Sequence, residues 1–205
     1  QPFVRLAARE ENLKSVKRRG ARHIRGATLF EDVILAALVT WNAADKPDFS
    51  CVSRLVDRLG IPLPQNPTRH AFPEPARILN NSRQLHNLFG PELAARAHGI
   101  ATDWEDTKAE LGEIAQHPPN VDELAVYLAQ RFRLTPEGIS LLMLNLGRYD
   151  YIPTDDVALR RFTQATQDEK AAPQDIRAFF ARWQPWGGLA YWLWDWAAMT
   201  EPSGN

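Results

Sequence analysis

The sequence has little of what defines several large classes of protein. It contains a single cysteine, Cys51, which can form neither an intramolecular disulfide nor a thiolate zinc site nor a cysteine-ligated iron–sulfur cluster. It has no run of 18 apolar residues, so no membrane-spanning helix is predicted, and its first 25 residues show no apolar core of a signal peptide. We therefore expect a cytoplasmic protein in a reducing compartment.

Net charge is also scarce, because 24 basic and 25 acidic residues give −1. A net charge near zero argues against a protein whose whole surface is basic and binds nucleic acid. The charge is uneven, however: the first 30 residues hold eight basic and two acidic ones, a local charge of +6. Residues 1–29 are therefore predicted to form a basic N-terminal arm, which either contacts phosphate groups or is simply a solvated helix face.

Helical periodicity is abundant. Hydrophobic residues make up 44% of the chain and charged residues 24%, a globular composition, and 205 residues suit one domain or two lobes that share a core. Apolar residues at helical spacing begin at Phe30, Val33, Ile34 and Ala37. We predict an all-α fold for residues 30–205, with a proline-rich loop at 63–75 and no strand or repeat. Helices after this loop are predicted at 74–80, 91–98, 103–116, 121–131, 136–146, 156–166, 173–183 and 186–199.

Metal and cofactor chemistry finds no support. No two of the five histidines have the i, i+4 spacing of a metal pair on a helix. No glycine-rich phosphate loop follows a strand, and no Gly-x-Ser-x-Gly elbow is present. We predict no metal and no cofactor.

Two adjacent carboxylates, Asp155 and Asp156, follow Pro153 and precede an amphipathic helix. Either can be a plain N-cap, where the helix dipole favours a negative charge. Either can instead be a functional carboxylate at the mouth of a cleft, where it would stabilise a developing cation or orient a water molecule.

Tryptophan is concentrated near the C-terminus, where five of the seven lie between Trp183 and Trp196. The last predicted helix is apolar on nearly all sides, so most of these rings are expected in the core. One or two at the edge of a cleft would form a platform on which a nucleobase can stack.

Together these segments resemble the helix-hairpin-helix DNA glycosylase superfamily, most closely the branch of bacterial 3-methyladenine DNA glycosylase II. The similarity covers residues 28–199. The segments that carry it are Phe30-Glu-Asp-Val-Ile-Leu-Ala-Ala-Leu38-Val-Thr-Trp41, His70-Ala-Phe-Pro73-Glu-Pro75, Leu146-Gly-Arg-Tyr-Asp150, the Pro-x-Asp-Asp turn and the ending from Pro185-Trp186 to Trp194.

This resemblance implies a two-lobed helical fold with the catalytic aspartate at the cleft between the lobes. The spacing Pro-x-x-Asp before Val-Ala-Leu-Arg-Arg selects Asp156, which we favour narrowly, whereas the spacing of other branches selects Asp155. Cleavage of an N-glycosidic bond gives the sugar oxocarbenium character, which a carboxylate stabilises after the base has been flipped out of the helix. Trp194, Trp186 and Trp41 are candidates for contacts with the base.

The sequence departs from the family at the hairpin. Pro136 occupies the position of the catalytic lysine of bifunctional relatives, which implies a monofunctional hydrolase. The usual Gly-hydrophobic-Gly is replaced by Phe132-Arg133-Leu134, so Arg133 and the helix start at Thr135 are the remaining candidates for phosphate contacts. Leu38 aligns with the residue that fills the gap left by a flipped base, or it is an ordinary core residue.

The leading hypothesis is a monomeric, nucleoid-associated DNA glycosylase that removes a damaged, alkylated base from double-stranded DNA. A catalytically silent relative that binds DNA or a protein partner is the alternative, and the altered hairpin favours it. A plain helical interaction domain is a third possibility, and only this one predicts no DNA binding at low salt.

Overall fold

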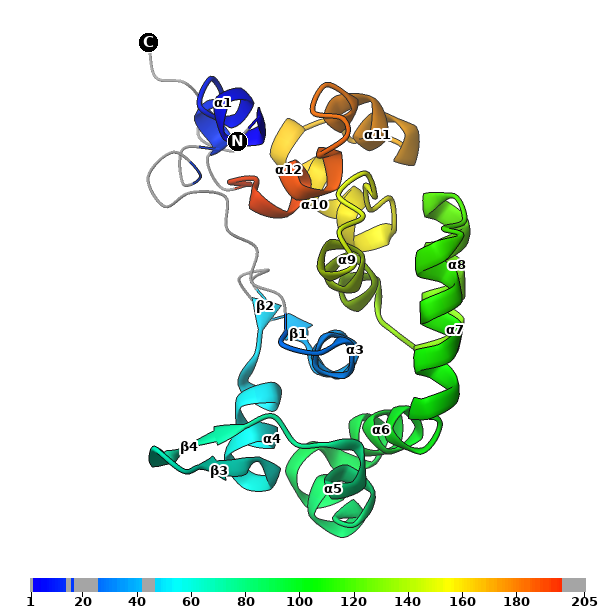
Figure 1. The fold of residues 1–205 in the computed structure, drawn as a ribbon. Coiled ribbons are helices and arrows are strands. Elements are labelled where there is room, and N and C mark those ends of the chain that lie inside the picture. Colours follow the sequence, from blue (N-terminus) through cyan, green and yellow to red (C-terminus); the bar gives the residue numbers. More distant parts are fainter. Residues whose placement is uncertain (1, 14–15, 17–25, 42–46, 197–205) are drawn as a thin grey trace. The chain divides into compact units, whose positions relative to one another are not determined.

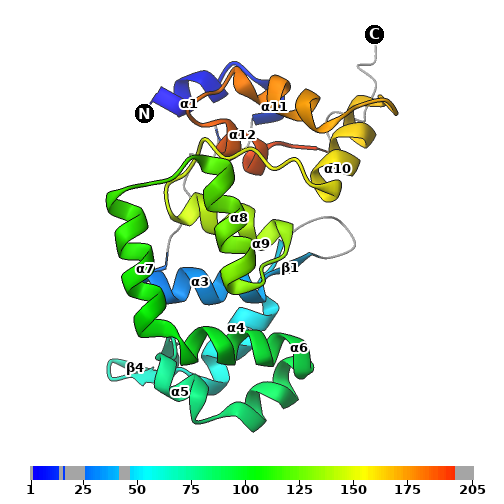
Figure 2. The ribbon, with the colours of Figure 1, turned by 90° about the vertical axis from the view of Figure 1, so that its right-hand side faces the viewer.

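The computed structural model describes residues 2–13, 16, 26–41 and 47–196, which are mostly helical (Figures 1 and 2). The chain divides into two compact units. The central unit comprises Arg25–Leu142, and the terminal unit comprises Gln1–Ile24 and Met143–Asn205. The predicted helical, two-lobed fold is confirmed, while the cleft between the lobes stays a prediction.

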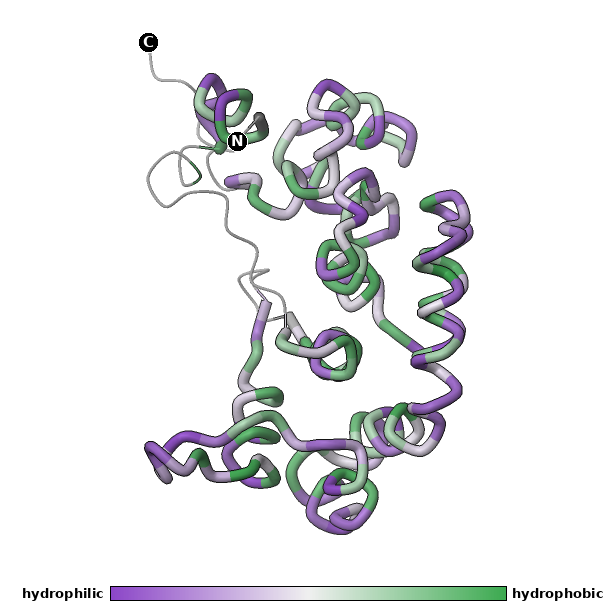
Figure 3. Tube along the Cα trace, in the orientation of Figure 1, coloured by the Kyte–Doolittle hydropathy of each residue, from purple (hydrophilic) through white to green (hydrophobic). Residues whose placement is uncertain are grey.

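The central unit is organised around α3 (Leu29–Leu38), which contacts α4 (Ser50–Leu59), α6 (Ser82–Thr102) and α7 (Trp104–Gln116). Its sequence explains this position, because apolar side chains occur on nearly every face and seven of its ten residues are buried. Thr28 begins the helix, since its hydroxyl accepts a hydrogen bond from the backbone N–H of Glu31 at 3.3 Å. Figure 3 shows α3 as a largely hydrophobic segment.

The remaining helices of this unit are α5 (Pro75–Leu79), α8 (Val121–Phe132) and the first part of α9 (Pro136–Asn145), which continues into the terminal unit. Observed bounds of α8, α9 and α10 lie within one residue of the predicted ones. The helix predicted at 91–98 is longer than expected, because α6 also includes residues 82–89. Gly90, at φ 77° and ψ 174°, breaks this helix immediately before Pro91.

Two short antiparallel pairs correct the prediction that the chain has no strands. β1 (Thr40–Trp41) pairs with β2 (Pro47–Asp48), and β3 (Ile61–Leu63) pairs with β4 (Asn66–Ala71). Of these strands, β4 lies inside the segment 63–75 expected to be a loop. Residues 61–71 are mostly exposed, and β4 is largely hydrophilic in Figure 3. With no face turned to a core, these strands lack the apolar alternation that identifies a strand from sequence.

The terminal unit contains α1 (Pro2–Ala7), the 3₁₀ turn η1 (Glu11–Leu13), α10 (Asp156–Thr166), α11 (Pro173–Ala181) and α12 (Gly187–Leu193). Its core is aromatic: Phe180, fully buried, contacts the rings of Trp183, Tyr191 and Trp194 at centroid distances of 5.4–5.5 Å. α12 ends at Leu193, earlier than the predicted helix at 186–199.

The N-terminal residues join this core, which the sequence did not suggest. Phe3, Ala7, Leu13 and Val16 are buried in the same cluster as Phe180. Of the basic residues predicted to form an arm, Arg5 and Arg9 are exposed. The other basic positions, Lys14, Lys17, Arg18, Arg19, Arg22 and Arg25, lie outside the described residues.

Candidate functional site

The segment between α9 and α10 fixes one of the two candidate carboxylates. Asp155 is the N-cap of α10, and its Oδ1 accepts hydrogen bonds from the backbone N–H groups of Val157 at 2.9 Å and Ala158 at 3.0 Å. The side chain is half-buried. Within the described part of the chain, its second oxygen, Oδ2, has no hydrogen-bond partner. Asp155 is therefore held in one orientation while keeping one oxygen available.

Asp156 differs in each of these respects. It is the first residue of α10, its side chain is exposed, and it makes no side-chain hydrogen bond or ion pair among residues 2–13, 16, 26–41 and 47–196. A carboxylate that acts on a developing charge must be held in place before the reaction. The local geometry therefore favours Asp155, in contrast to the narrow preference for Asp156 that came from the spacing after Pro153.

A pair of glycines supports the backbone that leads to Asp155. The N–H of Gly188 donates to the carbonyl of Tyr149 at 2.8 Å, and a Cβ on Gly188 would overlap the carbonyl oxygen of Tyr151. A Cβ on Gly187 would lie 2.8 Å from the side chain of Ile152. The start of α12 therefore packs directly on residues 149–152. Sequence reasoning missed these glycines, although they follow Pro185-Trp186 directly.

Arg148 stiffens the same segment. Its Nε lies 3.2 Å from Oδ1 of Asp150, and its second terminal nitrogen lies 3.2 Å from Oδ2 of the same carboxylate. This two-point arrangement fixes both side chains more firmly than a single contact. The turn before it begins at Gly147, whose φ of 78° lies in the left-handed region that favours glycine.

The predicted base-contacting residues are less accessible than expected. Trp194 is 5% exposed, and its ring contacts Phe179 at 5.4 Å and Trp183 at 5.1 Å between centroids. Trp186 is half-buried and lies 6.3 Å from the ring of Phe3. The structure thus places Trp194 in the aromatic core of the terminal unit and leaves Trp186 as the more open of the two rings.

Two further candidates lie in the central unit. Leu38 is completely buried in the core at the end of α3, and its role in filling the gap left by a flipped base stays a prediction. Trp41 lies in β1, where it pairs with Pro47. The backbone of Trp41 is described, and its side chain lies outside the described part of the structure.

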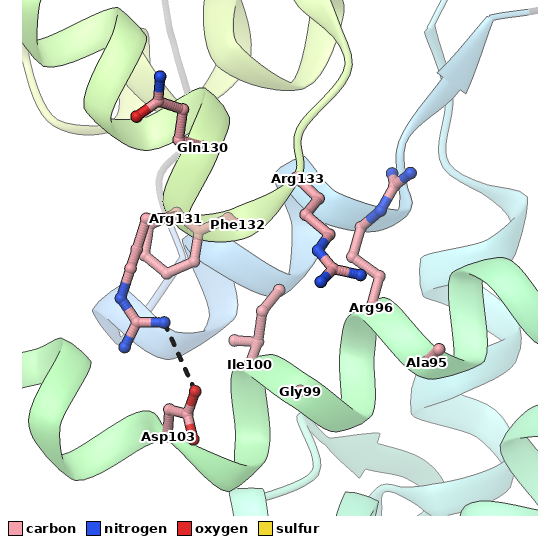
Figure 4. Close-up of a pocket in the computed structure, with 9 residues that line it drawn as sticks. All are labelled: Ala95, Arg96, Gly99, Ile100, Asp103, Gln130, Arg131, Phe132 and Arg133. Atoms are coloured by element: carbon pink, nitrogen blue, oxygen red, sulfur yellow. Dashed lines mark ion pairs between the residues drawn. The ribbon is translucent and has the colours of Figure 1, made fainter.

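The hairpin between α8 and α9 borders a cavity of about 390 Å³. Arg133 ends α8 in the left-handed conformation at φ 51° and ψ 46°, and its side chain is exposed (Figure 4). Thr135 begins α9, since its Oγ1 accepts from the N–H of Gly138 at 3.2 Å. The cavity is lined by Ala95, Arg96, Gly99, Ile100, Asp103, Gln130, Arg131, Phe132 and Arg133.

A polar network holds one of the arginines of this cavity. Arg131 donates to Glu110 at 3.0 Å and to Thr107 at 2.7 Å, and it lies 3.6 Å from a carboxylate oxygen of Asp103. Tyr127 donates its hydroxyl proton to the same Glu110 oxygen at 2.6 Å. The hydrogen bonds from Tyr127 and Arg131 lower the pKa of Glu110. Burial, with the hydrogen bond to Glu110, raises the pKa of Tyr127 to about 12.

This shift predicts an alkaline loss of stability. Because the pKa of Tyr127 is higher in the folded state than in the unfolded chain, the contribution of this residue is complete below about pH 10 and is lost as pH rises toward about 12. In a spectrophotometric pH titration, the difference in tyrosinate absorbance between the wild-type protein and Tyr127→Phe is the signal of Tyr127. We expect this difference to have a midpoint about two pH units above that of an ordinary tyrosine. A difference with a midpoint near 10 would contradict the network.

In the described part of the chain, no helix is long and apolar enough to cross a membrane. No group of three or more His, Cys, Asp or Glu side chains among these residues is arranged to hold a metal ion.

Comparison with known proteins identifies the fold. No protein-family model and no curated protein matches the sequence. Among solved structures, MBOgg1 in complex with a low-affinity DNA ligand has a TM-score of 0.70 and 15% identity, covering 98% of this chain and 71% of that one. The 8-oxoguanine glycosylase/lyase of Clostridium acetobutylicum in its apo form has a TM-score of 0.67 and 15% identity, covering 98% and 70%.

The same Clostridium enzyme in complex with double-stranded DNA that contains cytosine opposite 8-oxoguanine has a TM-score of 0.70 and 16% identity, covering 96% of this chain and 69% of that one. The chain therefore has the fold of the helix-hairpin-helix DNA glycosylases. The two Clostridium structures are of an 8-oxoguanine glycosylase/lyase. The three structures named here do not single out the 3-methyladenine branch that the sequence resembles.

Proposed function

We propose that this protein is a monofunctional DNA glycosylase that hydrolyses the N-glycosidic bond of an alkylated purine in double-stranded DNA. The observation that carries the proposal is Asp155, which is fixed by two backbone N–H groups at the start of α10 and keeps Oδ2 available. The glycosylase fold supports it, because the fold is shared with structures of enzymes that act on DNA bases.

In this mechanism the damaged nucleotide leaves the base stack, at a cost of a few kcal/mol that a damaged base reduces. As the bond between the sugar and the base lengthens, positive charge develops on the sugar. Oδ2 of Asp155 stabilises this charge and accepts a proton from the attacking water, while Oδ1 remains bound to the helix. Trp186, as the more open ring, is proposed to contact the base, with Trp194 behind it and Trp41 as a further candidate.

Hydrolysis, rather than strand cleavage through a lysine, is proposed on two grounds. Pro136 stands where the resemblance places the catalytic lysine of bifunctional enzymes. Lys170 is the one lysine in the described part of the terminal unit. It lies just beyond the C-terminal end of α10, whereas Asp155 lies at the N-terminal end of this helix. The 11 residues of that helix span about 16 Å, too far for both groups to act on one sugar carbon.

A second substrate, 8-oxoguanine, is favoured by a different observation. Two of the three similar structures are of an enzyme named for this base. We place it second because the sequence segments that carry the resemblance point to the alkylation-repair branch.

The test is excision from defined duplexes under single-turnover conditions, using 7-methylguanine, 3-methyladenine, 8-oxoguanine and uracil as lesions. We expect release of an alkylated purine, leaving an abasic site that is cleaved only after alkali treatment. Direct strand cleavage would contradict the monofunctional assignment. Tight, salt-sensitive binding to an abasic-site analogue with no product from any lesion would replace the enzyme with a catalytically silent DNA-binding protein.

A further inference from the structure

Arg133 occupies a backbone position that is costly for arginine. At φ 51° its conformation is left-handed, which disfavours every residue with a Cβ relative to glycine. In the described part of the chain its guanidinium has no ion-pair or hydrogen-bond partner, and it is exposed. Figure 4 shows this side chain extending from the hairpin into the cavity, toward α6. An exposed, unpaired and conformationally unfavourable arginine suggests a ligand for its side chain.

Several of the backbone donors of the hairpin are already occupied. The N–H groups of Arg133 and Leu134 both donate to the carbonyl of Ala129, where they close the last turn of α8. Pro136 has no N–H, and the N–H of Gly138 donates to Thr135. An anion that approaches this turn therefore finds few free backbone donors.

The side chains around the cavity supply what the backbone lacks. Arg131 is compensated by Asp103 and Glu110, so it adds little net charge. Arg96 is anchored by a 3.0 Å hydrogen bond to the carbonyl of Ala37 at the end of α3, which leaves its side chain 11% exposed. Its other partner, Glu92, is 84% exposed at 3.1 Å. Because the carboxylate of Glu92 is largely exposed to solvent, this ion pair is weak and another anion can replace Glu92.

We propose that the cavity between α6 and the hairpin binds one phosphate of a DNA strand through the guanidinium groups of Arg133 and Arg96. The hairpin thus anchors DNA with side chains in place of its backbone N–H groups. Arg133 donates from the turn and Arg96 from α6. A planar guanidinium group can donate two parallel hydrogen bonds to two oxygens of the same phosphate. This inference rests on the proposed function for the identity of its ligand as DNA, while its geometry stands without the chemistry at Asp155.

The test is Arg133→Gly, since it removes the side chain and relieves the backbone conformation together. We expect equal or higher thermal stability, roughly tenfold weaker binding to a duplex with an abasic-site analogue, and a slope of log K against log salt that is smaller by about 0.9. Unchanged or tighter binding would mean that the backbone is the anchor and would overturn the proposal.

Gln167→Gly is the matched control, because Gln167 has the same left-handed conformation, at φ 56°, at the end of α10. It should reproduce the stability change and leave DNA binding unaltered. Arg96→Gln should weaken binding by a similar factor, whereas Arg58→Gln, which removes an exposed arginine from α4, should change it less than twofold.

Two further measurements separate the possible outcomes. In the first, inorganic phosphate and a 5′-mononucleotide are titrated into the wild-type protein and into Arg133→Gly. If either ligand binds tightly and depends on Arg133 while DNA does not bind, the cavity is a site for a free phosphorylated ligand and the proposal is overturned. Excision is measured in parallel. If the wild-type protein excises no base but loses DNA binding on Arg133→Gly, the phosphate site is upheld and the proposed enzyme activity is rejected. If the protein excises a base but binds DNA equally well with and without Arg133, the enzyme activity is upheld and the phosphate site is rejected.

Discussion

Replacing Asp155 by asparagine should reduce base excision by about 10²–10³-fold and leave the fold intact. Removing a fixed charge that stabilises a transition state costs about this much. Asparagine is as good an N-cap as aspartate, so its side-chain oxygen can retain the hydrogen bonds to the N–H groups of Val157 and Ala158. The measurement is the single-turnover rate on the best lesion of the panel, together with the thermal midpoint of each variant.

Asp156→Asn is the matched control. It removes the same charge one residue further along the chain, from an exposed side chain with no partner in the described part of the structure. We expect a rate within a few-fold of wild type. If Asp156→Asn is the inactive variant and Asp155→Asn is active, the spacing after Pro153 identifies the catalytic residue correctly and the geometry does not. If neither affects the rate, the catalytic assignment to this turn is wrong.

This pair of residues shows what the sequence can predict about the candidate site and what requires the structure. The sequence indicates that one of two adjacent carboxylates matters, because Pro153, two aspartates and an amphipathic helix form a recognisable pattern. Spacing alone leaves both open, since either residue can cap the helix. The choice depends on which side chain turns back to the backbone of α10, which is decided by the dihedral angles at Asp155.

The fold follows the same division. α3, α8 and α10 are predicted well because their apolar stripes and caps are local signals. The β3–β4 pair is missed because it is held by main-chain hydrogen bonds in an exposed segment and leaves no hydrophobic pattern. Trp194 illustrates a third case: the sequence allows this ring to lie in the core or to contact a base, whereas its contacts with Phe179 and Trp183 place it in the core.

Gly187 and Gly188 could not be interpreted from the sequence because the constraint on them is not local. Their importance lies in the approach of α12 to residues 149–152, more than 30 positions earlier in the chain. A glycine pair after Pro185-Trp186 looks like an ordinary helix start. Only the positions of the carbonyls of Tyr149 and Tyr151 show that a side chain has no room there.

Gly188→Ala should therefore destabilise the protein and slow catalysis together. The added Cβ would overlap the carbonyl oxygen of Tyr151, which is backbone and cannot rotate away. Overpacking of this kind costs about 1–3 kcal/mol of unfolding free energy, and the rigid contact suggests the upper end. Displacing residues 149–152 also moves Asp155, and a shift of about 1 Å in a catalytic group can cost about 10²-fold in rate. Urea unfolding and single-turnover excision measure the two effects.

Gly112→Ala separates this steric argument from a general effect of alanine. Gly112 lies inside α7, and nothing is within 4 Å of a Cβ built there, so alanine should stabilise the protein by about 0.5–1 kcal/mol without changing the excision rate. A Gly188→Ala variant that loses stability but keeps its full rate would show that residues 149–152 can move without displacing Asp155. A variant with wild-type stability would show that α12 does not pack on this segment in solution. The two readouts together therefore test whether the glycine pair positions the carboxylate or only supports the core.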